Sequence, residues 1–309
     1  MDQNPLISYV VTAYNIEEYI AEAIQCAFAQ TYSPLEIVLS DDCSTDRTFE
    51  IMQQMASEYK GPHQIVLNRN TENLGITRHM NKAYIDIANG QIIVAAHGDD
   101  ISDAKRTELS WLFLRDNLEI TAVSFSLDAF DDKGNFLPGH SSSVDCLQLY
   151  DFKKGGNIPA PSRAFYKRVM LVFGPLNEDC PTEDECISFR ALLLGKNAFL
   201  PDHIVKYRKH EKSSSNPEFF DRFPLEKILK QQDDDMKKAV QLGLIDDNDR
   251  QRKYAELEKN MHLRKVYREY FSKRTISSWV KLVMYKNITT RRRFHYIKEH
   301  FEFLMGNHE

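Results

Sequence analysis

The chain has 309 residues, of which 42% are hydrophobic and 28% charged, and its formal net charge is −5. This length is enough to bury a sizeable core, so we expect one large domain with an appendage. The sequence shows neither a signal peptide nor an apolar run of about 18 residues that could cross a bilayer. Its five cysteines lack the short paired spacings of a zinc site. A cytoplasmic protein with reduced thiols is therefore expected.

Charge is distributed unevenly along the chain. From Gln251 to the end there are 14 Lys and Arg against 6 Asp and Glu, whereas the rest of the chain has 26 against 39. A basic tail on an acidic body indicates contact with an anionic partner, for which nucleic acid and a phospholipid surface are both candidates.

In chain order, strand-like and helix-like segments alternate over the first hundred residues. Short apolar runs rich in β-branched residues predict strands at 6–12, 35–42, 63–68 and 91–97. Apolar positions at helical spacing predict helices at 17–30, 44–59 and 76–90. This alternation predicts an α/β fold with a mostly parallel sheet flanked by helices.

The second half of the chain is less regular. Residues 121–136 predict a strand, an Asp-Asp-Lys-Gly turn and another short strand, and residues 182–195 predict a helix. From Pro224 onward the pattern is helical, rich in charge and almost free of Gly and Pro. We therefore place an α/β domain at 1–223 and a helical extension at 224–309.

Three polar clusters follow predicted strands: Thr-Ala-Tyr-Asn at 12–15, Asp-Asp-Cys-Ser at 41–44 and His-Gly-Asp-Asp at 97–100. Ligands of parallel sheets bind beyond the carboxyl ends of the strands, so these clusters should share one crevice. Because no Gly-x-Gly-x-x-Gly or P-loop motif is present, backbone amides are not expected to neutralise a phosphate here. A hard divalent cation held by carboxylates would do so.

The residues in these clusters carry a resemblance. The segment from "VVTAYNIEEYIAEAIQ" to "LEIVLSDDCSTDRTFEIM", the block "NLGITRHMNKAYIDIANGQIIVAAHGDD" and the block from "FGPLNEDCPTEDECISFRALLLG" to "YRKHEKSSS" resemble the family 2 glycosyltransferases in order and spacing. The similarity runs from about Ile7 to Ser215. It implies the GT-A nucleotide-sugar-binding fold and, in bacteria, a role in polysaccharide or O-antigen synthesis.

The resemblance also implies roles for individual residues. It assigns nucleotide contacts to Thr12, Tyr14, Asn15, Asp41, Asp42, Arg78 and Asp99. Within this group the Tyr14 ring would lie against the base and Asp42 would accept a hydrogen bond from it, which favours uracil. Asp100, Asp99 and His210 are the expected ligands of Mn²⁺ or Mg²⁺. His97 stands where the family's Asp-x-Asp motif has its first Asp, so the division of labour between Asp99 and Asp100 stays open.

Asp184 aligns with the family's catalytic base, and Glu183 is its rival. The cluster "EDCPTEDE" holds five acids, and a helix N-terminus also attracts acids through its dipole alone. A base that removes the proton of an acceptor hydroxyl, opposite a departing nucleoside diphosphate, would invert the anomeric centre. The expected reaction is inverting transfer from a UDP-sugar to a glycan or lipid-linked saccharide, which forms a β-glycosidic bond.

Three other classes of protein compete with this interpretation. A nucleotidyltransferase acting on sugar phosphates would carry a Gly-rich, basic loop after the first strand, and "TAYNIEEY" does not. An inactive nucleotide-sugar-binding module would be expected to have lost Asp100 or Asp184, and both are present. Nucleic-acid binding has only the basic tail in its favour, without any recognisable motif, so no nucleic-acid partner is expected.

The tail at 275–305 combines apolar residues at helical spacing with Trp279 and with three consecutive arginines from Arg291 to Arg293. Such a segment fits an interfacial helix at the inner face of the cytoplasmic membrane. It fits equally a helix that packs on the catalytic domain or on a second subunit in a homo-oligomer. The sequence alone leaves these alternatives open.

Overall fold

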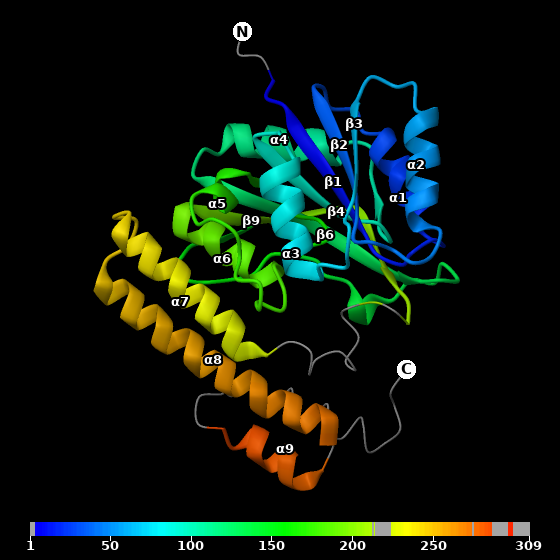
Figure 1. Cartoon of the computed structure of the whole chain (residues 1–309). Helices are drawn as coiled ribbons and strands as arrows, with labels where there is room; N and C mark the ends of the chain where they lie inside the picture. The colour runs from blue at the N-terminus through cyan, green and yellow to red at the C-terminus, as the bar shows by residue number, and fades with distance from the viewer. Residues whose placement is uncertain (1–3, 212, 214–223, 274, 286–295, 299–309) are drawn as a thin grey trace.

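The computed structural model describes the chain except residues 1–3, 212, 214–223, 274, 286–295 and 299–309 (Figure 1). A nine-stranded sheet forms its centre, with strand order β3-β2-β1-β4-β8-β6-β9-β5 and with β7 paired to β9. Within the described part of the chain, no helix combines the length and the apolar composition that a membrane span requires.

Four parallel strands make up the first half of the sheet. They are β1 (Ile7–Ala13), β2 (Leu35–Asp41), β3 (Gln64–Arg69) and β4 (Ile92–His97). Every residue of β1 and β2 is buried, because helices cover both faces of this half. The predicted strands at 6–12, 35–42, 63–68 and 91–97 are thus confirmed to within one residue or two at each end.

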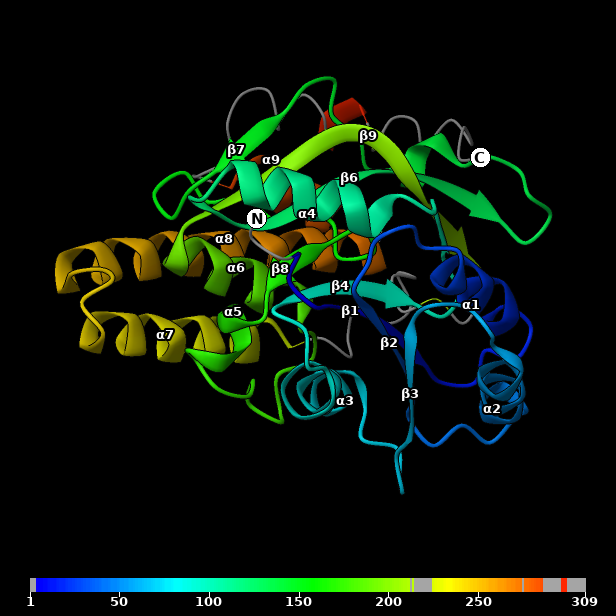
Figure 2. The same ribbon diagram turned by 90° about the horizontal axis from the view of Figure 1, so that it is seen from above.

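Alternate residues of these strands point into two separate cores. Tyr9 and Val11 of β1 pack with α1 (Ile20–Phe28), α2 (Thr48–Glu58) and α4 (Arg106–Asp116). Val10 faces the other core, which includes α3 (Ile76–Asn81) and the π-helical turn that continues it (Lys82–Ile87). Figure 2 shows α1 and α2 on one side of β1 to β3 and α3 on the opposite side. The fold is therefore a three-layer α/β arrangement, as expected.

The second half of the sheet is mixed. Its strands are β5 (Ile101–Ser102), β6 (Ile120–Asp131), β7 (Gln148–Tyr150), β8 (Ala164–Tyr166) and β9 (Lys196–Lys209). The three-residue strand β8 is antiparallel to both of its neighbours, whereas β6 and β9 run parallel to each other. The second strand predicted within 121–136 is wrong: residues 132–136 form no strand, and an isolated bridge joins Phe136 to Phe130 of β6.

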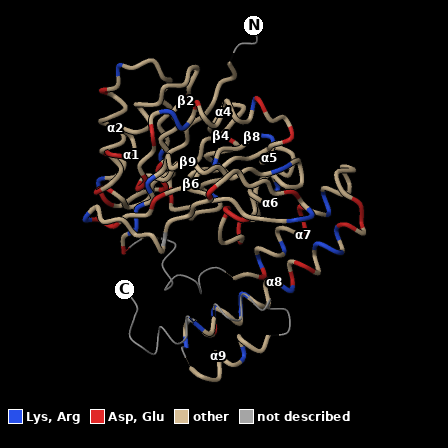
Figure 3. The backbone as a smooth tube through the Cα atoms, turned by 180° about the vertical axis from the view of Figure 1, so that it is seen from behind, with Lys and Arg blue, Asp and Glu red and all other residues tan. Residues whose placement is uncertain are grey.

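The C-terminal part is helical, as the composition predicts. After α5 (Arg168–Leu171) and α6 (Asp184–Leu194) come α7 (Leu225–Gln241), α8 (Asp247–Lys273) and α9 (Ile276–Val283). Pro224, where the composition changes, directly precedes α7. Figure 3 shows both signs of charge along α7 and α8. The helices α7 and α8 are joined to the sheet domain through α6, which packs against α7 by Phe189 and Leu193.

Candidate functional site

The carboxyl ends of β1, β2 and β4 meet at one edge of the sheet. Their pairing sets Thr12 of β1 opposite His97 of β4, and Ala13 of β1 opposite Asp41 of β2. The three polar clusters predicted from the sequence therefore start side by side. Parallel sheets bind their ligands beyond this edge, the carboxyl ends of the strands.

Hydrogen bonds between the first two clusters fix the loops that follow β1 and β2. The Asn15 amide N–H donates to Ser44 Oγ (2.9 Å), and the Asn15 side-chain oxygen accepts from the Thr45 N–H (2.8 Å). Asp41 is fully buried and accepts from the Ser44 N–H (2.9 Å). Asn15 and Asp41 are thus placed to hold the loops, whereas Tyr14 remains 45% exposed beside them. An exposed tyrosine at this edge offers a ring on which a base can stack.

Asp42 joins the β2 loop to the loop before α3. Its two carboxylate oxygens accept from the Leu74 N–H and the Gly75 N–H, both at 2.9 Å. Arg78 lies on the helix that follows and donates from Nε to the Leu74 carbonyl (2.8 Å). The side chains of Asp42 and Arg78 therefore both form a hydrogen bond with the backbone of Leu74. Much of the hydrogen-bonding capacity of Asp42 is already used within the protein.

The third cluster forms a group that could hold a metal ion. One ligand atom each from His97, Asp99 and Asp100 lies within 4.8 Å of the others. Asp100 is 3% exposed, and its Oδ1 accepts from the Arg208 N–H (3.0 Å). Its Oδ2 is buried without a hydrogen-bond partner, 3.6 Å from His97 Nδ1. A buried carboxylate oxygen without a partner is costly, and a hard cation at this position would satisfy it.

The electrostatics of the two aspartates differ. Burial, together with the charge of neighbouring Asp99, raises the pKa of Asp100 well above its usual value. Burial would also raise the pKa of Asp99, but the hydrogen bond from His210 and the electrostatic interaction with His97 outweigh it and lower that pKa. A divalent ion would favour the charged form of both carboxylates.

His210 lies on Asp99. Its Nε2 is 3.0 Å from Asp99 Oδ2, and its ring packs on that of Tyr19 with centroids 4.9 Å apart. His210 was expected as a metal ligand; the structure places it on Asp99, beside the metal-ligand group of His97, Asp99 and Asp100 and not within it. His97 was not among the predicted ligands. The signal that could have identified it is its position at the first residue of the Asp-x-Asp pattern.

Asp184 and Glu183 stand at the N-terminus of α6 in different surroundings. Glu183 is 3% exposed, and its Oε1 lies 3.9 Å from the buried Arg163 guanidinium. Burial and the neighbouring charge of Asp184 raise the pKa of Glu183 well above its usual value. Asp184 is only partly buried, and its backbone carbonyl accepts from Arg163 Nη1 (2.8 Å).

Arg163 also ties this helix to the sheet edge. Its carbonyl accepts from the N–H of Ala95 (3.0 Å), a β4 residue two positions before His97. The same backbone segment is contacted by Arg106, whose guanidinium is fully buried and donates to the Ala95 carbonyl. Arg163 therefore connects the strand that carries His97 with the helix that carries the acid pair, and Arg106 holds the same strand from α4.

Comparison with known proteins agrees with this geometry. The family model described as "Glycosyl transferase family 2" matches residues 8–170, which span β1 to α5 and include the metal-ligand group. The chain belongs to glycosyl transferase family 2. An "uncharacterized glycosyltransferase" of Haemophilus influenzae is 28% identical to it over 231 residues, 70% of this chain and 69% of the relative.

Two solved structures, both bound to nucleotide sugars, share the fold of this family 2 chain. TarS residues 1–349 of S. aureus, in complex with UDP-GlcNAc, align with a TM-score of 0.66 and 18% identity, over 90% of this chain and 78% of TarS. The mannosyltransferase PcManGT of Pyrobaculum calidifontis, in complex with GDP-Man and Mn²⁺, aligns with a TM-score of 0.59 and 16% identity. The alignment covers 99% of this chain and 89% of PcManGT. The predicted GT-A fold and the predicted enzyme class, a glycosyltransferase, are confirmed.

Proposed function

We propose that this glycosyltransferase moves a sugar, with inversion, from a UDP-sugar to a hydroxyl of a saccharide acceptor, and that it requires Mn²⁺ or Mg²⁺. The observation that carries the proposal is the buried, unpartnered Asp100 Oδ2 within a His97–Asp99–Asp100 group at the carboxyl edge of the sheet. It is supported by the solved relatives of the same fold, one bound to UDP-GlcNAc and the other to GDP-Man with Mn²⁺.

The donor would lie along the edge formed by β1, β2 and β4. Tyr14 is the exposed aromatic ring there and would stack on the uracil base. Arg78, on α3 just after the loop that Asp42 holds, would face the nucleotide, with Thr12, Asn15 and Asp41 shaping the loops around it. We propose that Asp100 and Asp99 hold the cation together with His97, while His210 orients Asp99 by its hydrogen bond. When bound, such a cation stabilises the charge of the departing diphosphate.

Asp184 is the residue that would remove the proton of the acceptor hydroxyl. It is the more accessible member of the acid pair, whereas Glu183 is buried against Arg163 and its pKa is raised. A buried carboxyl with a raised pKa ionises less readily and is shielded from an acceptor hydroxyl, so this difference favours Asp184. Proton removal on the face opposite to the leaving group inverts the anomeric centre and, from an α-linked donor, gives a β-glycoside.

For residues 224–309 we propose a helical extension that places the enzyme at its acceptor, a polysaccharide or O-antigen precursor on the cytoplasmic membrane face. The described part of α9 supports this by exposing one apolar stripe: Ile276 is 71% exposed, Val280 45% and Met284 67%. An apolar stripe on an amphipathic helix binds either a membrane interface or another subunit. The basic residues Arg291 to Arg293 lie outside the described residues.

The test is the release of UDP from a panel of UDP-sugars, with and without Mn²⁺, by the wild-type protein and two variants. We expect turnover only with the metal. Asp184→Asn should lower turnover by about 10²–10⁴ while leaving donor affinity unchanged, because a general base acts in the transition state. Glu183→Gln is the matched control and should remain active. Loss of activity in Glu183→Gln with an active Asp184→Asn would transfer the role of base to Glu183.

A further inference from the structure

Two of the five cysteines lie with their sulfurs in contact. Cys180, in the loop before α6, and Cys186, in the first turn of that helix, have their Sγ atoms 3.5 Å apart. No other pair of cysteines in the described part of the chain shows a contact between sulfurs. Since the sulfurs of a disulfide are about 2 Å apart, an approach of roughly 1.5 Å would bring these thiols to bonding distance.

The proposed base lies inside the loop that such a bond would close. Glu183 and Asp184 stand between the two cysteines, at the point where α6 begins. The Cys180 thiol donates to the Thr182 carbonyl (3.3 Å), and the Thr182 hydroxyl oxygen accepts from the Asp184 N–H (3.4 Å). The segment that carries the acid pair is therefore held in part by a thiol hydrogen, which a disulfide would remove.

Cys180 is the thiol that an oxidant meets first. It is 2% exposed but directly follows the exposed residues Glu178 and Asp179, whereas Cys186 is fully buried. The hydrogen bond from Cys186 lowers the pKa of Cys180, and the same contact, together with burial, raises the pKa of Cys186 well above its usual value. Because the thiolate is the form that attacks a peroxide, Cys180 is the nucleophile and Cys186 the thiol that follows.

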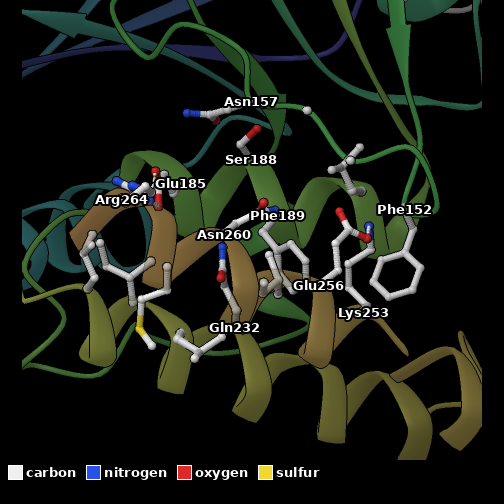
Figure 4. A pocket seen from close by; sticks show the side chains of 18 of the residues that line it. Phe152, Asn157, Glu185, Ser188, Phe189, Gln232, Lys253, Glu256, Asn260 and Arg264 are labelled. Atoms are coloured by element: carbon white, nitrogen blue, oxygen red, sulfur yellow. Dashed lines mark hydrogen bonds and ion pairs between the residues drawn. The ribbon is translucent and has the colours of Figure 1, made fainter. Parts of the chain in front are cut away.

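Helix α6 is fixed from its other sides, so the closure would fall on the loop before it. Arg264 Nη1 of α8 lies 2.7 Å from Glu185 Oε1 at the wall of a cavity between α6, α7 and α8 (Figure 4). Further along α6, Arg190 donates two hydrogen bonds of 2.9 Å to Asp235 of α7. Residues 181–184 would therefore take up the movement, and a displacement of about 1 Å at a catalytic group can lower turnover about 10²-fold.

We propose that Cys180 and Cys186 are a modification site, at which hydrogen peroxide forms a disulfide that displaces Asp184 and slows transfer. The Cys180 thiolate attacks one peroxide oxygen and breaks the O–O bond, which leaves a sulfenic acid and, after protonation of the departing hydroxide, one water. The Cys186 thiol then attacks that sulfur, and the sulfenic hydroxyl leaves with the Cys186 proton as a second water. The two thiols lose two electrons and the peroxide gains them. The effect on transfer rests on the proposed function, whereas formation of the disulfide does not.

Peptide mapping of the full chain, before and after treatment with hydrogen peroxide, tests the bond itself. Residues 169–190 contain no Lys or Arg before Arg190, so trypsin releases one peptide that carries both cysteines and no other. After denaturation and treatment with iodoacetamide, we expect this peptide to carry two alkyl groups in the untreated protein. In the oxidised protein it should carry none and be lighter than the dithiol peptide by two hydrogens. Two alkyl groups, or a sulfinic acid in place of the disulfide, would overturn the proposal.

Release of UDP from a UDP-sugar, measured in the same samples, tests the effect on transfer. We expect turnover to fall at least tenfold on oxidation and to return with dithiothreitol, while UDP binding with Mn²⁺ stays unchanged. Cys180→Ala should lose this sensitivity to peroxide. Cys146→Ala, which removes an exposed thiol, and Cys43→Ala, which removes the thiol next to Asp42, should keep it. Each variant is compared with its own untreated sample.

The remaining outcomes separate the disulfide from the proposed function. A disulfide that leaves turnover unchanged would contradict the proposal, as would a loss of sensitivity in Cys146→Ala or Cys43→Ala. The peptide map of the wild type needs no variant, so it decides the disulfide even where Cys180→Ala does not fold. Absence of UDP release by the reduced protein from every UDP-sugar would refute the proposed function, and the effect on transfer with it.

Discussion

The pair formed by Arg190 and Asp235 fastens α7 to α6, and its removal should destabilise the protein strongly. Arg190 is fully buried and donates from Nε and Nη2 to the two carboxylate oxygens of Asp235, both at 2.9 Å. Its Nη1 donates to the Gly174 carbonyl (2.7 Å). The substitution Asp235→Asn keeps the shape of the side chain but leaves the guanidinium without a charge partner.

The expected loss can be estimated from burial. Burial raises the pKa of Asp235 more than Arg190 lowers it, so the attraction within the pair does not fully offset the cost of desolvation. Removal of one partner of such a pair nevertheless costs about 3–5 kcal/mol, because the other charge stays buried. We expect about 3 kcal/mol for Asp235→Asn, since its amide oxygen can still accept one bond. For a chain of this size that is a fall in melting temperature of roughly 6 °C.

Differential scanning calorimetry of two variants measures this effect. The control is Asp234→Asn, one residue earlier, whose partner Lys230 is 64% exposed at 2.7 Å. An exposed pair contributes about 0–1 kcal/mol, so the melting temperature of this variant should barely move. Equal shifts for Asp234→Asn and Asp235→Asn would refute the argument that the buried pair holds α7 on α6.

Three further predictions concern the acid pair, the metal group and the tail. The pKa of Glu183 is raised in the folded state, so its ionisation lowers the stability of the protein as the pH rises above 4.5, the pKa of a glutamate in the unfolded chain. Glu183→Gln should therefore have a higher melting temperature than the wild type near pH 8, and this difference should vanish near pH 4. A difference in melting temperature that stays constant between pH 4 and pH 8 would contradict the raised pKa of Glu183. His97→Gln should weaken Mn²⁺ binding at least tenfold by titration calorimetry, whereas His203→Gln, at an exposed His–Asp pair 2.8 Å apart, should leave it unchanged. The protein should sediment with anionic but not neutral liposomes at low salt. Val280→Asp should abolish this sedimentation, whereas the control Leu118→Asp, on the exposed turn between α4 and β6, should not. A salt-resistant dimer that does not bind liposomes would instead favour packing between subunits.

The parallel half of the fold could be predicted from the sequence because of how it is buried. A strand covered on both faces is a nearly continuous apolar run, and β1 and β4 are such runs ending in polar clusters. Once these strands are parallel, the clusters at their ends must meet. The neighbourhood of Tyr14, Asp41 and His97 therefore followed from the pattern alone.

The rest of the sheet could not be predicted in this way. The strand β8 has three residues, which is too short for any periodic pattern, and β6 pairs with β9 about 75 residues later along the chain. Such pairings depend on tertiary packing that no local window of sequence contains.

The measurement that tests the central claim most directly is titration calorimetry of UDP into the wild-type protein and Asp100→Asn, with Mn²⁺ and with EDTA. The account predicts that Mn²⁺ strengthens UDP binding to the wild type and has no effect on Asp100→Asn, because the unpartnered Asp100 Oδ2 is the proposed ligand of the cation. Asp116→Asn, at an exposed position, should behave like the wild type. UDP binding that is equally strengthened by Mn²⁺ in Asp100→Asn would contradict the proposed metal site and the mechanism that depends on it.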